Sequence, residues 1–413
     1  MLAVSGRRGR SILASHLLPP FVHSQILTYV NVRTKWKKDT FYDTLEVVNE
    51  SKELKTIITL KNVIVRSSER CIPISDVSKM SRIFEIHGRV AAFFRKYPSF
   101  FKEFTGPHHD LPWFALTPEA EALDLEERAI FEDRSVELFD RLRRLIMMTK
   151  EKRLPLQIIH GMQWYLGLPE DFTKRLRETE DIAGWFRLVE VENGVKELGI
   201  DDDGIEYPPP LSVVQKNVLR LLKSGGGSVA DISSPHNISF PVYPSKGVRL
   251  KRKIADWLEE FQKLPYLSPY DHDHHREWNT NSDLSDKRVV GVLHELLSLM
   301  VDHSAERRRL LCLRKHLCLP QKFGRAFERH PLIFYLHMKN KTCNVVLKEG
   351  YHGGQTSAIE LHPMLPVREK YVQLMRESDV ILRRKRSGKV YSVSVRPRFR
   401  SKEEESGCKP KES

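Results

Sequence analysis

A pattern of phenylalanine and proline occurs near both ends of this 413-residue chain and restricts its fold more than any other feature. The spacing is identical in the two copies, which are Phe94, Pro98, Phe101 and Phe327, Pro331, Phe334. Proline lacks an amide donor and clashes with the preceding helical turn, so each copy predicts a helix that ends before the proline. A short apolar run returns after each copy, at Trp113–Leu116 and Val345–Leu347. Each copy therefore predicts a helix followed by a two-stranded hairpin.

A third and weaker copy lies between these two. Leu166–Phe172 matches Leu317–Phe323 at both leucines, the proline and the phenylalanine. After it, Trp185–Val191 and Val195–Leu198 flank an Asn-Gly pair, which favours a tight hairpin turn because both residues tolerate positive φ. The irregular spacing of the copies excludes a solenoid with a fixed period. We predict a mainly α fold with small β-hairpins (α+β), built from about three helix-helix-hairpin, winged-helix-like modules, with chance recurrence of such elements as the alternative.

The charge of the chain indicates a polyanionic partner. The net charge is +14, with a pI of about 9.4, which favours nucleic acid and also suits an anionic membrane surface. No apolar run approaches 18 residues, so no membrane span is expected. The five cysteines form no CxxC pair, which argues against a thiolate zinc site and favours a reducing compartment.

The N-terminal segment has the profile of an organellar transit peptide. It is basic, contains serine, is mildly amphipathic and lacks the apolar core of a secretory signal. A basic arm of a nuclear protein is the alternative. We predict a transit peptide over 1–28 and, because the leader is short and arginine-rich, the mitochondrion rather than the chloroplast. The remaining expected divisions are a first part of the main domain, a linker or insertion, a second part of that domain and a basic disordered tail, over 29–200, 201–247, 248–377 and 378–413.

Several longer helices are expected. One begins near Ser75 or Asp76 and runs to Pro98, and another begins at the Thr117 cap and continues to about Lys150. A last helix begins at about Pro366. The acidic and histidine-rich run 271–275 is interpreted as a solvated loop, so no metal site is predicted.

Clusters of lysine and arginine are the candidate sites for phosphate groups, with one aromatic residue for base stacking. A solvated helix surface is the alternative for each of them. The candidate RNA-binding residues are Lys35, Trp36, Lys37, Lys38, Arg141, Arg143, Arg144, Lys174, Arg175, Arg307, Arg308 and Arg309.

Motifs of catalysis and of cofactor binding are missing from the sequence. It has no GxSxG, no HExxH, no Walker sequence and no dinucleotide fingerprint, and no serine or cysteine in a recognisable nucleophile context. We therefore expect no enzyme activity and no cofactor.

Seven segments in order along the chain resemble the plant organelle RNA recognition (PORR) domain family. They are KWKKDTFYD, Phe94–Leu116, WFALTPEAEAL, RLRRLIMMTKEKRLPL, WYLGLPEDF, RHPLIFYL and VREKYVQLM. The resemblance implies a nucleus-encoded organellar protein that binds intron RNA and promotes group II intron splicing without catalysing a reaction. Its implied partners are organellar intron RNA and other splicing factors, and its oligomeric state stays open. Two alternatives remain, a protein-protein scaffold in an organellar ribonucleoprotein and a hydrolase of the deubiquitinase kind.

Overall fold

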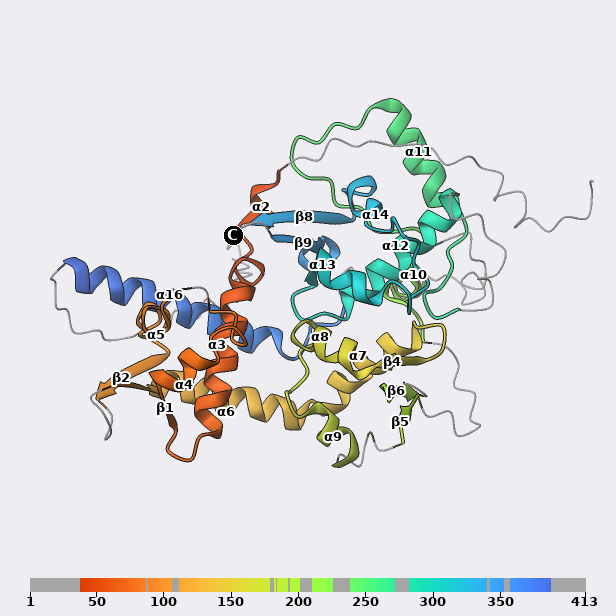
Figure 1. Ribbon diagram of the computed structural model, residues 1–413. Coiled ribbons are helices and arrows are strands. Elements are labelled where there is room, and N and C mark those ends of the chain that lie inside the picture. Colours follow the sequence, from red (N-terminus) through yellow and green to blue (C-terminus); the bar gives the residue numbers. More distant parts are fainter. Residues whose placement is uncertain are drawn as a thin grey trace, which may run out of the picture.

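The computed structural model describes residues 38–387 except for 87, 106–110, 179–181, 183, 192–193, 201–209, 226–237, 272–281, 340–341 and 353–356. It is mainly helical with three small antiparallel sheets, which confirms the predicted fold class. Figure 1 shows three groups of elements, with the first module at the lower left, the second at the lower right and the third above it. None of the helices in the described ranges is both long and apolar enough to cross a membrane.

The three modules have the same order of elements, which is helix, strand, helix, helix, strand, strand. The first contains α3 (Glu46–Arg66), β1 (Cys71–Pro73), α4 (Ile74–Lys79), α5 (Val90–Lys96), β2 (Phe101–Thr105) and β3 (Pro112–Leu116). The second contains α7 (Ser135–Met147), β4 (Arg153–Pro155), α8 (Leu156–Leu166), α9 (Phe172–Glu178), β5 (Phe186–Glu190) and β6 (Lys196–Ile200). The third contains α12 (Asp283–Ser298), β7 (Ser304–Glu306), α13 (Arg307–Leu310) with the 3-10 turn η4 (Leu311–Leu313), α14 (Arg325–Arg329), β8 (Phe334–Lys339) and β9 (Thr342–Leu347). In each sheet the last strand lies in the middle, with orders β1-β3-β2, β4-β6-β5 and β7-β9-β8.

The repeated phenylalanines have the same packing role in the first and third modules. Phe94 contacts Phe101 edge to face with ring centroids 4.7 Å apart, and Phe327 contacts Phe334 in the same way at 5.3 Å. Each pair joins the helix before the proline to the first strand of the hairpin, and aromatic pairs favour this geometry. The repeated sequence pattern therefore corresponds to the same packing contact in the first and the third module.

A left-handed backbone position also repeats in all three modules. It falls 12 residues after the end of the first strand, at Glu85, Gly167 and Cys318. In each case the following amide donates to the carbonyl five residues before it, which is the Schellman arrangement at a helix end. Only the second module has glycine there, because a methyl group on Gly167 would come within 2.6 Å of the His362 ring and 2.8 Å of Val301.

Two large cores and one small one hold the modules together. The largest joins the second and third modules with α10 (Val213–Gly225) and α11 (Arg252–Lys263), and another joins the first module with α16 (Leu365–Ser387). Helix α6 (Pro118–Asp133) packs between α7 and α16. The small core packs Tyr42 of α2 (Thr40–Asp43) and Val48 of α3 on Tyr335 and Val346 of the third sheet. The N-terminal end of the first module, together with α2 before it, therefore packs on the sheet of the third module.

Several expected boundaries differ in the structure. The single helix expected from about residue 75 to Pro98 is two helices, α4 and α5, because the chain turns at Glu85 with positive φ. The helix expected from the Thr117 cap to about Lys150 is divided at Arg134 into α6 and α7. The Thr117 hydroxyl accepts a hydrogen bond from the Ala120 amide, so the predicted cap is confirmed.

The expected linker and tail contain ordered helix. Within 201–247, α10 buries Val213 and Val214 against the main core, and Ile238 and Phe240 are buried as well. At the other end, α16 continues to Ser387 and so takes up the first part of the expected tail. The acidic and histidine-rich run keeps only Asp271 inside the described residues.

Candidate nucleic-acid interface

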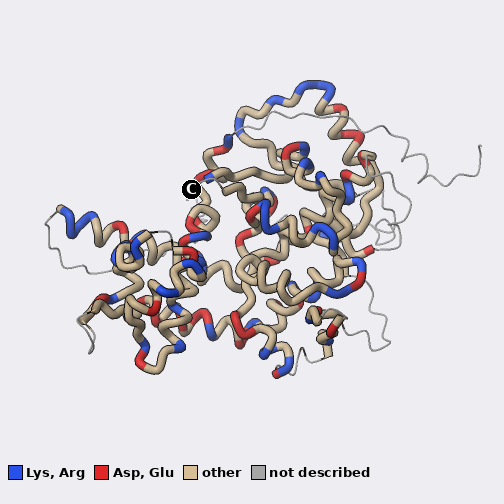
Figure 2. Tube along the Cα trace, viewed as in Figure 1, with Lys and Arg blue, Asp and Glu red and all other residues tan. Residues whose placement is uncertain are grey.

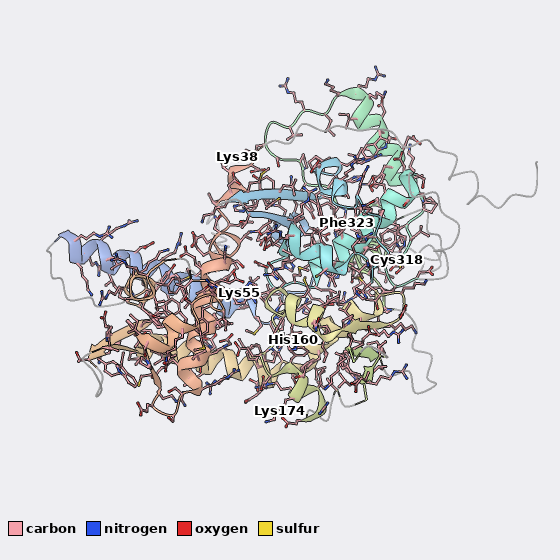
Figure 3. The ribbon with its side chains drawn as sticks, viewed as in Figure 1. Lys38, Lys55, His160, Lys174, Cys318 and Phe323 are labelled. Carbon is pink, nitrogen blue, oxygen red and sulfur yellow. The ribbon has the colours of Figure 1, made fainter. Side chains whose placement is uncertain are left out.

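Helix α3 has one apolar face and one basic face. Leu54, Ile57 and Leu60 are fully buried in the core of the first module. Lys52 and Lys55 lie three residues apart, which places them on one face of the helix. That face is turned towards the second and third modules, because Lys55 lines cavities together with residues of α8 and α13. Figure 3 shows Lys55 between the first module and the other two.

A groove runs along this face of α3. Two cavities of about 510 and 580 Å³ adjoin at Lys52, Glu85 and Thr342, which line both of them, and together they are called the groove below. The walls come from α3, from the turn and helix around α5, from α8, and from β7, α13 and the β8–β9 hairpin. All three modules therefore contribute to a single surface.

The lining of the groove is basic. Its charged residues are seven cations (Lys52, Lys55, Arg89, Lys96, Arg308, Arg309 and Lys339) and four carboxylates (Glu50, Glu53, Glu85 and Glu306). Lys96 pairs with Glu53 at 2.5 Å and Lys339 with Glu50 at 3.1 Å.

Three of the seven cations that line the groove remain available to bind a phosphate group. Lys52, Arg89 and Arg308 are exposed and form no ion pair with any residue in the described ranges. An unpaired surface cation neutralises a phosphate without first giving up a protein partner. These three residues are therefore the strongest candidates for phosphate contacts.

Glu85 lies in the middle of the groove at the left-handed helix end. Its carboxylate is 3.8 Å from Lys55 and 3.9 Å from Arg309, so it bridges the first and third modules. Exposed ion pairs at such distances contribute little to stability. A phosphate could take the place of this carboxylate between the two cations.

Two arginines predicted as phosphate contacts are buried instead. Arg141 is 4% exposed and donates to the Glu360 and Leu361 carbonyls, while Arg144 is 6% exposed and pairs with Glu295 at 2.7 Å. Burial and the neighbouring Arg144 lower the pKa of Arg141 to about 10. Burial acts to lower the pKa of Arg144 as well, but Tyr270 and Glu295 raise it above its ordinary value. Both side chains hold the fold together and are not on a surface that RNA can reach.

The other predicted basic residues are scattered. Arg143 lies over the Trp185 ring, with 5.2 Å between the guanidinium carbon and the ring centroid. Lys174 and Arg175 lie on α9, away from the groove, and pair with Glu178 and Asp171 (Figure 3).

Near the groove, Arg307 pairs with Glu328 at 3.1 Å and donates to the Gly324 carbonyl. Lys38 is exposed and 3.5 Å from Asp43. Lys35, Trp36 and Lys37 lie outside the described residues. Among the predicted residues that the structure describes, only Arg308 and Arg309 line the groove.

Sequence reasoning missed the remaining groove cations because they do not cluster along the chain. Lys55 and Lys339 are nearly 300 residues apart and meet only through the fold. One signal was present, since Lys52 and Lys55 face the same way if 46–66 is recognised as a helix.

Three of the four cysteines in the described residues do not have the environment of a nucleophile. Burial raises the pKa of the Cys71, Cys312 and Cys343 thiols, and a nearby carboxylate adds to the effect at Cys71. A nucleophilic cysteine needs the opposite shift, towards the thiolate. Cys312, which lines the groove, is therefore not activated as a thiolate.

Comparison with known proteins identifies the family. The model of the plant organelle RNA recognition domain matches residues 37–380. The chain is 50% identical over 364 residues to Protein WHAT'S THIS FACTOR 9, mitochondrial, of Arabidopsis thaliana, a match that covers 88% of this chain and 90% of that protein. It is 28% identical over 342 residues to Protein WHAT'S THIS FACTOR 1, chloroplastic, of Zea mays, covering 81% and 66%. It is 27% identical over 398 residues to Protein ROOT PRIMORDIUM DEFECTIVE 1 of Arabidopsis thaliana, covering 92% and 90%. No solved structure matches the chain.

The chain belongs to the plant organelle RNA recognition family, as its sequence motifs predicted. Its role is organellar and related to RNA. The relative at 50% identity is named as a mitochondrial protein, which confirms the predicted mitochondrial location.

Proposed function

We propose that this protein binds organellar intron RNA in the groove along α3 and promotes group II intron splicing without catalysing a reaction. The observation that carries the proposal is the groove itself. Exposed cations from the first and third modules face each other across it in a chain of the organelle RNA recognition family. A mixed-charge surface helix would spread its lysines over solvent, whereas here they converge on one groove.

The proposed action is physical. Phosphate groups of single-stranded or looped RNA lie along the cations of the groove, and counterions are released from the RNA. Because the two walls belong to different modules, one bound segment is held from both sides. This lowers the cost of bringing intron phosphates close together, and the intron RNA performs its own chemistry.

The three modules support the proposal through their topology. Each has the order of elements and the middle position of the last strand that we infer to be winged-helix-like.

We also propose that residues 1–28 act as a transit peptide and are removed on import. N-terminal sequencing of the protein from purified mitochondria tests that cleavage, and an uncleaved N-terminus there contradicts it.

Sequencing of RNA that co-purifies with the protein tests the function. A tagged full-length chain is immunoprecipitated from purified mitochondria and from chloroplasts, and every organellar intron is quantified. We expect one or a few intron transcripts to be enriched, and the same introns to stay unspliced in plants that lack the protein. A test variant carries Lys52, Arg89 and Arg308 changed to glutamine and is expected to lose the enrichment. Intact protein that enriches no intron overturns the proposal and favours the protein-scaffold alternative.

A further inference from the structure

A small side cavity opens beside the basic groove. It has a volume of about 160 Å³ and is lined by residues of α3, α6, α8 and α16. It shares Lys55, Gly161 and Trp164 with the groove, so these three residues mark the opening between the two spaces. Figure 3 shows Lys55 of α3 and His160 of α8 near this opening. The volume is below that of sites for drug-sized ligands and suits a single planar ring.

The walls of this cavity carry rings that can stack on a base. Phe131, His160, Trp164 and Tyr371 all line it. Phe131 and Trp164 are half-buried and His160 is exposed, so part of each ring faces open space. Unstacked RNA bases are held on aromatic faces in this way.

Gly161 gives an independent indication that something occupies the opening. It lies in the interior of α8, where glycine is less favourable than alanine because it has more backbone freedom to lose. The glycines at 291 and 350 are explained by close neighbours, the rings of Tyr266 and His303. A methyl group on Gly161 would meet nothing within 4 Å. Packing within the protein does not account for this glycine, whereas close approach of a ligand does.

Arg368 adds a polar group at the inner wall. Its guanidinium carbon lies 3.9 Å from the centroid of the Trp164 ring, and its Nη2 donates to the Trp164 carbonyl. Its Nη1 is buried and has no hydrogen-bond partner among the described residues. A buried donor without an acceptor is costly. Because Nη1 is shielded from solvent, it does not open into the cavity, and the part of Arg368 that acts here is its guanidinium plane against the Trp164 ring.

We propose that this cavity binds one unstacked nucleobase of single-stranded RNA, and that Gly161 keeps its opening free. The proposal rests on the proposed function and adds a base-stacking site to a groove that otherwise contacts phosphates. The groove contacts the sugar-phosphate backbone of any strand, and the cavity adds a contact that requires a base.

A variant that closes the opening tests the proposal without removing a charge. Gly161→Leu places a side chain where the structure has open space and improves the helix, so the fold is kept. Binding of the full chain is measured by fluorescence anisotropy with two probes of about 20 nucleotides, a long probe relative to most single-strand sites. One is single-stranded RNA of random sequence, and the other has the same sugar-phosphate backbone without bases.

We expect Gly161→Leu to bind the random RNA about tenfold more weakly than the wild type, the size of one lost base stack. Because Gly161 also lines the groove, the affinity for the probe without bases is expected to fall as well, but by much less than the affinity for random RNA. The salt dependence stays unchanged, because no cation is lost. An equal loss of affinity with both probes overturns the base site.

Ala255→Leu is the matched control, since Ala255 is exposed on α11 and lines none of the cavities described above. It is expected to bind like the wild type. A folded Gly161→Leu protein with wild-type affinity for random RNA overturns the base site and leaves the proposed function standing. A wild type that binds neither probe overturns the proposed function itself.

Discussion

Neutralising the three unpaired groove cations should weaken RNA binding and flatten its dependence on salt. The variant changes Lys52, Arg89 and Arg308 to glutamine. For single-stranded nucleic acid, each phosphate contact contributes about 0.7 to the slope of log K against log salt, so three contacts contribute about 2. At about 0.15 M salt, this slope corresponds to a loss of roughly 50-fold in affinity. The three side chains are exposed, so the free energy of unfolding should change by less than about 0.5 kcal/mol for each.

The matched control removes the same charge elsewhere. Lys251, Arg252 and Lys253 are three exposed cations at the start of α11, and Figure 2 shows this segment at the edge of the molecule farthest from α16. Both triple variants are titrated with single-stranded RNA at four salt concentrations. We expect the α11 variant to keep nearly the wild-type slope. Equal losses of RNA affinity in the two variants would refute the groove as the binding site. They would show that RNA binding depends only on the net charge of the protein.

Three further predictions concern single residues. Glu85→Gln should tighten RNA binding about threefold, because a carboxylate some 6 Å from a phosphate costs about 0.7 kcal/mol in water; anisotropy checks this, and weaker binding contradicts it. Lys287 donates to the carbonyls of Ile238, Gln262 and Leu264, so Lys287→Met should lower the free energy of unfolding by about 2–4 kcal/mol in urea titrations. Burial lowers the pKa of His303 from 6.5 to about 4. Between these values the unfolded chain binds a proton that the folded chain does not, so stability should fall by up to about 3 kcal/mol as the pH drops. His303→Asn, which tolerates the positive φ there, should remove this part of the pH dependence, and urea titrations at several pH values measure it.

Residues close together in the sequence revealed the hairpins, because proline and phenylalanine act locally. The turn before the hairpin is the same in both copies, with the amides of Phe101 and Phe334 donating to the carbonyls of Tyr97 and His330. Both phenylalanines then pair with the last residue of the middle strand, Phe101 with Leu116 and Phe334 with Leu347.

The first strand of each module was missed for a physical reason. It is three residues long, which is too short to show the alternation of a strand. The residue before it, Arg70, Lys152 or His303, takes positive φ although none of the three is glycine. Nothing local marks these positions, since the strands form only when the hairpin of the same module supplies the middle strand.

The candidate site was the least predictable part, because it depends on distant partners. Arginine is seldom buried, so the sequence favoured an exposed Arg144. Its carboxylate partner, Glu295, lies 151 residues further along the chain and becomes a neighbour only when the second and third modules share a core. The groove arises in the same way, from cations that belong to separate modules.

The position of the groove between modules leads to a prediction about its closure. The start of the first module rests on the third sheet through a small contact, in which the Tyr335 hydroxyl accepts from the Asp39 amide and donates to Asp43 at 2.8 Å. RNA held by both walls binds this docked arrangement better than an open one, so it should stabilise the contact by linkage. We expect amide hydrogen exchange in α2 and the first turn of α3 to slow when RNA is added. Tyr335→Phe should speed that exchange in free protein, because both hydrogen bonds are lost, and RNA should restore the protection. Exchange in α2 that is unaffected by saturating RNA would mean that the strand contacts one wall only, and the groove would then not be the shared site of the first and third modules.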